Sequence, residues 1–264
     1  MIRGAFCSSL VLALLSRPAS SGDPPAAPSL SAEDIAQRAL DNNLFATHDA
    51  SASLTIRVER RGHLIRERKL RTKMKRSEGL VRALVEFDTP ADVAGTRFLS
   101  IEEAAGKTQQ FIYLPAFKKV KRVVGSQRDK SFMGTDFSFA DLEGRDVKAS
   151  TWKRLPDETI DGQVCFVIEG VPRNRDDEPY GRIVSWVRKD TLVPVAASLY
   201  ARDGVTLEKR LEVKKLQKKG GRTLATETWM STPRAESTTK LILTAIDLET
   251  ELNDDAFRPE ALER

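Results

Sequence analysis

The sequence predicts a mainly β protein, a half-open antiparallel β-barrel of about 11–13 strands with an N-terminal helix and a short mid-chain helical lid. Three observations lead to this prediction. Apolar and polar residues alternate with a period of two over most of residues 51–248. A stretch with helical periodicity precedes them at residues 31–44. Residues 131–142 interrupt the alternation with large apolar side chains set among turn residues.

The first 22 residues have the composition of a secretory signal peptide. Arg3 supplies a positive charge, residues 10–15 form a short apolar core, and small residues follow at 19–22. The apolar core is shorter than the roughly 20 residues that a transmembrane helix needs. We therefore expect a signal peptide over residues 1–22 and a soluble, exported protein.

Residues 23–30 hold Pro24, Pro25 and Pro28, which predict a disordered linker, and residues 31–264 are expected to form a single domain. Cys7 would leave with the signal peptide and does not lie in a lipidation motif. Cys165 lies in the apolar run 164–168, so we interpret it as a buried structural thiol.

The helical segment begins with a capping signal. Ser31 can accept a hydrogen bond from the helix start while Asp34 reaches back to it. Ile35, Ala39, Leu40 and Leu44 then form an apolar stripe. One amphipathic helix should open the domain.

The alternating segments predict the strands in order. Residues 51–59 carry Ala52, Leu54, Ile56 and Val58 on one face. In residues 64–76 one face is strongly basic, and the other carries Leu64, Arg66, Arg68, Leu70, Thr72 and Met74. Asp203-Gly204 and Gly220-Gly221 predict hairpin turns. The remaining strands are expected at 80–87, 96–101, 108–114, 119–124, 148–155, 163–169, 182–188, 193–201, 205–216, 222–231 and 239–248.

A twisted sheet of this many strands tends to curl, so the pattern favours a partly closed barrel. Residues 131–142 contain Gly134 and two helix-start signals, at Thr135-Asp136 and at Ser138. They predict helical turns laid across the barrel mouth as a plug or lid, although a buried connection explains the pattern equally well. The candidate ligand-binding residues of this lid and of the barrel interior are Phe98, Phe111, Tyr113, Phe132, Met133, Phe137, Phe139 and Trp186.

Several motifs resemble the outer-membrane lipoprotein-sorting proteins, relatives of the LolA and LolB carriers of Gram-negative periplasms. The most specific is residues 132–142 (FMGTDFSFADL). Others are residues 92–99 (DVAGTRFL), 111–115 (FIYLP) with 118–122 (KKVKR), 186–194 (WVRKDTLVP) and the pair 256–257. The resemblance implies a half-open antiparallel barrel whose curved apolar face, covered by helices, accepts the acyl chains of a lipoprotein or a similar lipid. It implies no reaction.

A basic cluster next to the predicted lid is the candidate contact for lipid headgroups or for an acidic delivery partner. A solvated strand face is the alternative explanation. The cluster consists of Lys118, Lys119, Lys121 and Arg122.

Enzymatic, metal and nucleic-acid functions have little support in the sequence. His48 and His63 lie at a helix end and in a turn, without neighbours at metal-ligand spacing. Asp136 and Asp141, with Glu143 and Asp146 nearby, fit no calcium loop, and we interpret the first two as helix caps. We expect no catalysis, no cofactor, no metal and no nucleic acid.

The predicted function is that of a periplasmic carrier that binds lipoprotein acyl chains, phospholipid or other hydrophobic cargo and helps to sort lipoproteins to the outer membrane. Its expected partners are an inner-membrane transporter or an outer-membrane acceptor, and a monomer would suffice. The alternative is a periplasmic adaptor or scaffold associated with a membrane transporter and without lipid cargo. A continuous apolar cavity would favour the carrier.

Overall fold

The computed structural model describes residues 30–42, 49–104, 107–176 and 178–263. The chain divides into two units, residues 1–30 and 31–264, and the fold below belongs to the second. The predicted signal peptide, the predicted linker up to residue 29, Leu44 and His48 lie outside the described residues. Among the described residues, no helix has both the length and the apolar character needed to cross a membrane.

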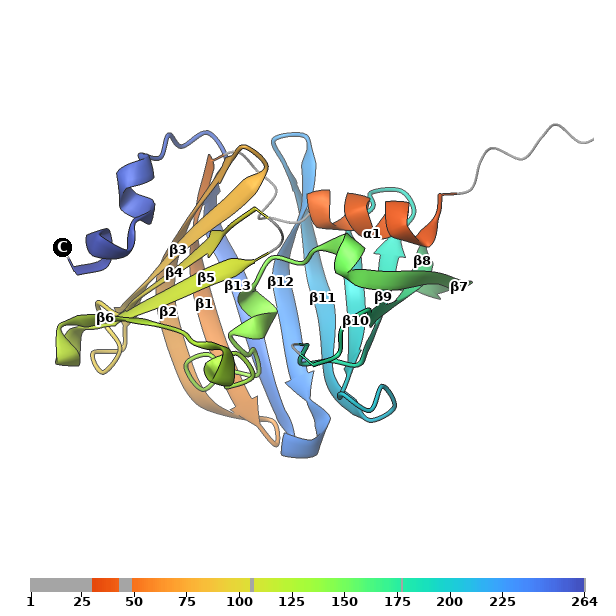
Figure 1. Cartoon of the computed structure of the whole chain (residues 1–264), viewed down its shortest axis with the longest axis horizontal. Coiled ribbons are helices and arrows are strands. Elements are labelled where there is room, and N and C mark those ends of the chain that lie inside the picture. The colour runs from red at the N-terminus through yellow and green to blue at the C-terminus, as the bar shows by residue number, and fades with distance from the viewer. Residues whose placement is uncertain (1–29, 43–48, 105–106, 177, 264) are drawn as a thin grey trace, which may run out of the picture. The chain divides into compact units, whose positions relative to one another are not determined.

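One antiparallel sheet of thirteen strands dominates the described residues (Figure 1). The sheet is open, because its edge strands β6 and β7 do not pair with each other. The predicted mainly β, half-open architecture is therefore confirmed. The strands are β1 (Asp49–Arg60), β2 (His63–Ser77), β3 (Leu80–Thr89), β4 (Arg97–Glu102), β5 (Thr108–Leu114), β6 (Lys119–Arg122), β7 (Ser150–Ile160), β8 (Gln163–Pro172), β9 (Arg182–Arg188), β10 (Pro194–Tyr200), β11 (Leu207–Lys219), β12 (Arg222–Thr232) and β13 (Ser237–Asp247).

The strand order is β6-β5-β4-β3-β2-β1-β13-β12-β11-β10-β9-β8-β7. Two meanders, β1–β6 and β7–β13, are therefore joined side by side through the pairing of β1 with β13. The chain passes from one edge of the sheet to the other only once, between β6 and β7, through residues 123–149.

The N-terminal helix α1 (Ala32–Asp41) begins where the capping signal predicts. The amide of Asp34 donates to Ser31 Oγ at 3.0 Å, and the Asp34 carboxylate accepts from the Ser31 amide, which completes a capping box. The helix buries Ile35, Ala36 and Ala39, and it packs against β7, β8 and a short 3-10 turn that precedes β7.

Strand β7 runs past the end predicted for it. The sequence prediction ended this strand at Leu155, and the next residue, Pro156, lacks an amide donor. The structure continues it to Ile160, with a register shift between Leu155 and Glu158 in the pairing with β8. A proline is tolerated here because β7 is an edge strand and the irregularity absorbs the missing hydrogen bond.

The remaining helical elements of the described residues are short 3-10 turns, and within the predicted mid-chain lid only Ala140–Leu142 forms such a turn. Those between β5 and β7 are η2 (Pro115–Phe117), η3 (Gly125–Gln127), η4 (Ala140–Leu142) and η5 (Val147–Ala149). Those in the C-terminal part are η6 (Pro233–Ala235), η7 (Asp254–Phe257) and η8 (Pro259–Glu263).

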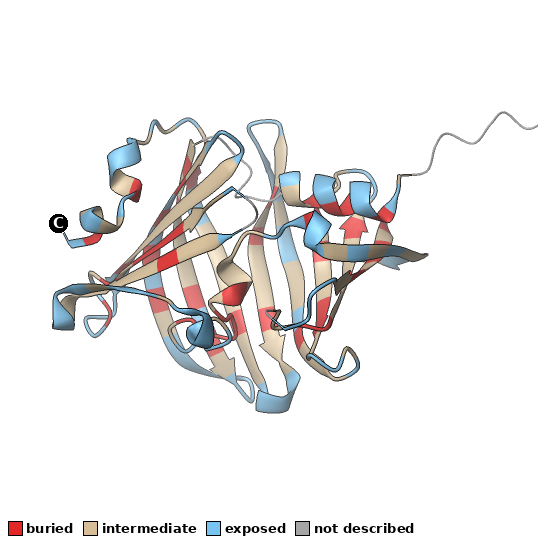
Figure 2. Cartoon of the chain, in the orientation of Figure 1, coloured by how far each residue is buried: buried red, intermediate tan, exposed pale blue. Residues whose placement is uncertain are grey.

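Buried residues are distributed along the strands of the sheet (Figure 2), and apolar residues of both faces are among them. We define the inner face as the one that carries Ile56, Leu70 and Phe98, which pack with residues of the β6–β7 connection. The outer face carries Leu99, which packs with Phe257 and Leu262 of the C-terminal turns. Neighbouring residues of a strand point to opposite faces, so Phe98 and Leu99 of β4 belong to two separate clusters, one on each face.

We predict that Phe257→Ala detaches the C-terminal turns from the outer face. Phe257 is only 2% exposed in the cluster with Leu99, so the truncation should lower the free energy of unfolding by about 3–5 kcal/mol in urea denaturation. Phe117→Ala is the matched control. Phe117 is 61% exposed, and its loss should change the free energy of unfolding by less than about 0.5 kcal/mol. Equal effects of the two substitutions would contradict this assignment.

Candidate functional site: a plug across the inner face

Residues 131–142, which we call the plug, form a small hairpin on the inner face. The Phe132 amide donates to the Phe137 carbonyl at 2.7 Å, and Ser131 bridges Ser138. The Thr135 amide donates to the Phe132 carbonyl at 3.0 Å, and the two residues between them, Met133 and Gly134, both have positive φ. This is the backbone of a type I′ turn, which favours glycine. The tip of the plug is therefore set by Met133 and Gly134.

The first half of the plug packs into an aromatic cluster. The Phe132 ring centroid lies 4.9 Å from that of Phe98, 5.5 Å from that of Phe139 and 6.2 Å from that of Phe87. Two of these contacts are edge-to-face, a favourable arrangement for aromatic pairs. Met133 is partly buried against the same cluster. The plug thereby covers the inner face of β3 and β4.

The second half of the plug packs on the other meander. Phe137 forms a buried cluster with Tyr180, Leu199 of β10 and Met230 of β12. One short hairpin therefore contacts both halves of the sheet through two phenylalanines five residues apart in sequence.

Asp136 fastens the plug to the middle of the sheet. Its carboxylate accepts hydrogen bonds from Thr239 Oγ1 at 2.7 Å and from Ser237 Oγ, both on β13, and its amide donates to Thr239 Oγ1 at 2.8 Å. Asp136 and Thr239 are buried, so each of these bonds replaces a hydrogen bond to water that the group loses on burial. Asp136 does not cap a helix, and that interpretation of it was wrong.

Asp141 forms a buried ion pair at the end of the plug. Its carboxylate lies 2.7 Å from Lys209 Nζ of β11 and accepts from Tyr180 Oη and from the Ser138 amide, each at 2.8 Å. The two charged side chains are 3% and 10% exposed. Burial alone would raise the pKa of Asp141, but the Lys209 ammonium and these hydrogen bonds outweigh it and lower the pKa.

The pKa of Tyr180 is shifted the other way overall, because nothing outweighs the effect of its burial. Its burial, followed by the nearby Asp141 carboxylate, raises the pKa of the phenol, so Tyr180 remains a hydrogen-bond donor at any physiological pH. Asp141 also retains part of its predicted capping role, because Ser138 and Asp141 exchange side-chain and backbone hydrogen bonds around the 3-10 turn η4.

The tip of the plug contacts two arginines of β2. Arg68 donates to the Met133 carbonyl, and Arg66 Nη1 donates to the Gly134 carbonyl at 3.1 Å. Gln110 of β5 donates from Nε2 to the Phe139 carbonyl at 2.9 Å. The plug is thus held by polar groups from β2, β5, β11 and β13.

The structure brings five of the eight candidate ligand-binding residues together. Phe98, Phe132, Met133 and Phe139 share one cluster, and Phe137 lies in the adjacent one.

Three candidates lie elsewhere. Phe111 and Tyr113 lie on the outer face with Leu99 and the C-terminal turns. Trp186 of β9 lies on the face opposite Ile183, which contacts the Phe137 cluster, and its Nε1 donates to Glu158 at 2.8 Å.

The basic cluster surrounds the short edge strand β6. Lys118, Lys119, Lys121 and Arg122 are all exposed, and Lys121 Nζ lies 4.9 Å from the ring centroid of the exposed Phe117. Lysines on an edge strand also discourage pairing with another sheet, so this position is consistent with the structural alternative.

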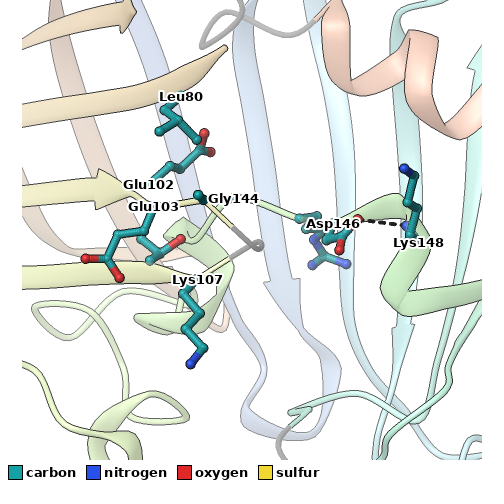
Figure 3. Close-up of a pocket in the computed structure, with 10 residues that line it drawn as sticks. Leu80, Glu102, Glu103, Lys107, Gly144, Asp146 and Lys148 are labelled. Carbon is teal, nitrogen blue, oxygen red and sulfur yellow. Dashed lines mark hydrogen bonds between the residues drawn. The ribbon is translucent and has the colours of Figure 1, made fainter. Parts of the chain in front are cut away.

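Two pockets flank residues 143–146, which follow the plug. The pocket in Figure 3 has a volume of about 340 Å³ and lies between the ends of β3–β5 and residues 144–148. Its lining is rich in charge and includes Glu102, Glu103, Lys107, Arg145, Asp146 and Lys148. A second pocket of about 120 Å³ is lined in part by Trp152, Tyr180 and Ile183. Neither resembles the mostly apolar cavity typical of lipid-sized ligands. The apolar surface under the plug is occupied by the side chains of the plug itself.

Sequence reasoning missed the residues that hold the plug in place. Ser237, Thr239, Lys209 and Tyr180 are ordinary strand or loop residues in the sequence. The one available signal was the arginine pair on the apolar face of residues 64–76, since charges on a face with Leu70 and Met74 require partners.

Cys165 is buried, and its burial raises the pKa of the thiol, as expected of a structural cysteine. Within the described part of the chain, no group of three or more histidine, cysteine or acidic side chains is arranged to hold a metal ion.

A protein-family model with the description "Uncharacterized protein"-like matches residues 79–264, which is more than half of the sequence. The chain belongs to this family. A search of curated proteins gives no match.

Solved structures show that this chain has the LolA-like fold. A DUF1329 family protein from Desulfovibrio piger has 29% identity and a TM-score of 0.81, with 88% of this chain and 97% of that chain covered. A domain assigned to outer membrane lipoprotein sorting, from Vibrio parahaemolyticus, has 28% identity and a TM-score of 0.81, with 88% and 98% covered. A LolA superfamily protein from Nitrosomonas europaea has 18% identity and a TM-score of 0.69, with 88% and 100% covered, and it supports the fold alone. The resemblance seen in the sequence motifs is confirmed.

We predict that Asp141→Asn lowers the free energy of unfolding by about 3–5 kcal/mol at neutral pH, because it leaves the Lys209 ammonium buried without its counter-ion. The pKa of Asp141 in the folded protein lies below its value of about 3.9 in an unfolded chain. Ionisation of Asp141 therefore contributes stability above about pH 4 and loses it as the pH falls towards the folded-state pKa. The difference between the wild type and the variant should shrink below about pH 4 in urea titrations. In the double variant Asp141→Asn/Lys209→Met, most of the loss should be recovered, and additive losses would argue against the pair.

We predict that Gly134→Ala loosens the tip of the plug. Gly134 has a φ of +72°, and a Cβ atom there would lie 2.5 Å from Arg66 Nη1. Gly62→Ala is the matched control, because Gly62 has a φ of +77° with nothing within 4 Å. In both variants the positive φ lowers the free energy of unfolding by about 1 kcal/mol, because alanine carries a Cβ atom. Only Gly134→Ala should also speed hydrogen exchange at the Phe132 and Thr135 amides, and unchanged exchange there would contradict the proposed packing of the tip.

Proposed function

We propose that the protein is a periplasmic, non-catalytic carrier that binds acyl chains on the inner face of its sheet and takes part in sorting lipoproteins or other lipids to the outer membrane. The observation that carries the proposal is the plug: a continuous apolar surface on the inner face, covered by one short hairpin of the same chain. The assignment of the Vibrio parahaemolyticus relative to lipoprotein sorting supports the same function.

The aromatic contacts of the plug can be exchanged for those of a lipid. Apolar burial is non-directional, and an acyl chain gains about 0.8 kcal/mol for each methylene that leaves water. A chain that replaces Phe132 and Phe137 on the inner face would restore much of the buried area that these side chains give up. The cost of opening then rests mainly on the polar contacts of Asp136 and Asp141, which a lipid tail cannot replace.

This balance suits a carrier, which has to shield its cargo in water and also release it. A plug held by a few polar contacts makes the open, binding-competent state a minor population. The apparent affinity for lipid is then the intrinsic affinity multiplied by the fraction of molecules whose plug is open. Export through the predicted signal peptide and delivery to a membrane acceptor are parts of the same proposal.

A periplasmic adaptor without lipid cargo is the second candidate. The observation that favours it is that the inner face is filled by the protein's own side chains, while the pockets beside the plug are charged or small. In an adaptor the plug would be permanent core, and partners would bind outside the sheet.

Uptake of a fluorescent fatty acid by the purified full-length protein separates the two candidates. We predict that Asp136→Asn tightens the apparent affinity roughly tenfold, because it weakens charge-assisted bonds to Thr239 and Ser237 and so populates the open plug. Asp129→Asn is the control: it removes the same charge from an exposed ion pair with Arg202 and should leave uptake unchanged. No uptake by any of the three proteins would favour the adaptor.

A further inference from the structure

Arg66 and Arg68 place two guanidinium groups next to each other on the inner face of β2. They lie two residues apart on one strand, so their side chains leave the same face with Cα atoms roughly 7 Å apart. In the register of β1 and β2, Arg66 lies opposite Val58 and Arg68 opposite Ile56. Arg66 is exposed at the end of the strand near the β1–β2 turn, whereas Arg68 is only 6% exposed.

Neither guanidinium has an acidic partner. Within the described residues, no carboxylate lies within 4.0 Å of Arg66 or of Arg68. Three arginines on the opposite face of β1, β2 and β4 are paired: Arg57 with Glu67 at 2.7 Å, Arg71 with Asp88 at 3.0 Å and Arg97 with Glu86 at 3.2 Å. Arg66 and Arg68 differ from these three in lying on the face that the plug covers, where no carboxylate of the described residues pairs with them.

Arg68 is buried with part of its hydrogen-bonding capacity unused. Its Nε atom has no hydrogen-bond partner, and its guanidinium carbon lies 5.9 Å from the ring centroid of Phe87. Burial, and then the like charge of Arg66, lowers the pKa of Arg68, and the Asp92 carboxylate offsets this only in part. A buried cation without a counter-ion is costly, so its position calls for an anion that the closed structure does not supply.

The plug supplies oxygens in place of that anion. The donors of Arg66 and Arg68 are directed at the Gly134 and Met133 carbonyls, two consecutive peptide oxygens at the tip of a turn. The two carbonyl oxygens therefore face the guanidinium groups in the way that two oxygens of a phosphate face arginine side chains. Lifting the plug would expose both arginines and leave them without an acceptor.

We propose that Arg66 and Arg68 form a subsite for the phosphate of a phospholipid headgroup, whose acyl chains lie along the inner face beyond them, and that the Met133 and Gly134 carbonyls occupy this subsite while the plug is closed. This proposal rests on the carrier function proposed above and specifies its cargo. Its geometry suits an amphiphile. Arg66 lies at the exposed end of β2, and Leu70 and Phe87 continue the same face as apolar surface. An acyl anchor that carries no phosphate would leave the subsite unused.

The test measures the selectivity of the full-length, delipidated protein for a phosphate-bearing lipid. Native mass spectrometry gives the affinities of dioleoylphosphatidylglycerol and of dioleoylglycerol, which has the same chains and no phosphate. Arg66→Gln is the first variant, because Arg66 is exposed and its loss leaves no buried cavity. The variant also loosens the plug, which affects both lipids alike, so the ratio of the two affinities is the readout. We expect this ratio to fall about tenfold in Arg66→Gln, and further in Arg66→Gln/Arg68→Gln.

Lys121→Gln/Arg122→Gln is the matched control for the double variant, because it removes two positive charges from the exposed cluster at β6 and should leave the ratio unchanged. An unchanged ratio in both arginine variants, or an equal fall in the control, overturns the subsite. Inorganic phosphate is a third probe, and binding as tight as that of phosphatidylglycerol overturns the lipid assignment, because the acyl chains would then contribute nothing. If neither lipid binds the wild type, the carrier function itself is overturned. If both lipids bind and only the selectivity ratio fails to change in the arginine variants, the subsite alone is overturned.

Discussion

The inner face of an open sheet has to be covered, and the rest of this structure depends on how that is done. Thirteen strands curl without closing, so the apolar residues of β1–β4 and of β10–β13 face a concavity that their own strands do not fill. The plug fills it with Phe132 on one side and Phe137 on the other. The polar residues beneath it follow from this arrangement, because a hairpin inserted into a concavity brings peptide groups that need partners. Thr239, Gln110 and the arginines of β2 provide them.

The plug is also part of the segment that connects the two edges of the sheet. It lies within residues 123–149, which link β6 to β7, and these strands are the outermost of the thirteen. Both of its ends are therefore tied to edge strands, and it cannot leave the inner face as a free arm. Any movement that lifts Phe132 and Phe137 has to be taken up by the segments that lead into β6 and β7. Opening of the plug and movement of the sheet edges are thus linked by the chain itself.

Local signals in the sequence were sufficient for the strands, the helix cap and the position of the plug. Alternation reports which residues share a face, and the capping box of Ser31 and Asp34 acts within one turn. Alternation does not report which face is the inner one, and this is why Phe111 and Tyr113 were grouped with Phe98 although the C-terminal turns cover them. The partners of Asp136 and Asp141 lie 103 and 68 residues away. Nothing near either aspartate in sequence identifies such partners, and a local role as helix cap was the natural interpretation.

The pairing of β1 with β13 has a consequence for the order in which the protein can fold. Each meander consists of hairpins between neighbours in sequence, whereas this single seam joins residues 51–60 to residues 237–247. Before β13 is in place, β1 and β12 are both unpaired edges of the kind that associate with other chains. Contacts of such long sequence separation form slowly, because the loop between them has to be ordered first. The sheet therefore cannot be completed by an N-terminal fragment, and a nascent chain gains its protected, continuous core only after almost its whole length is available.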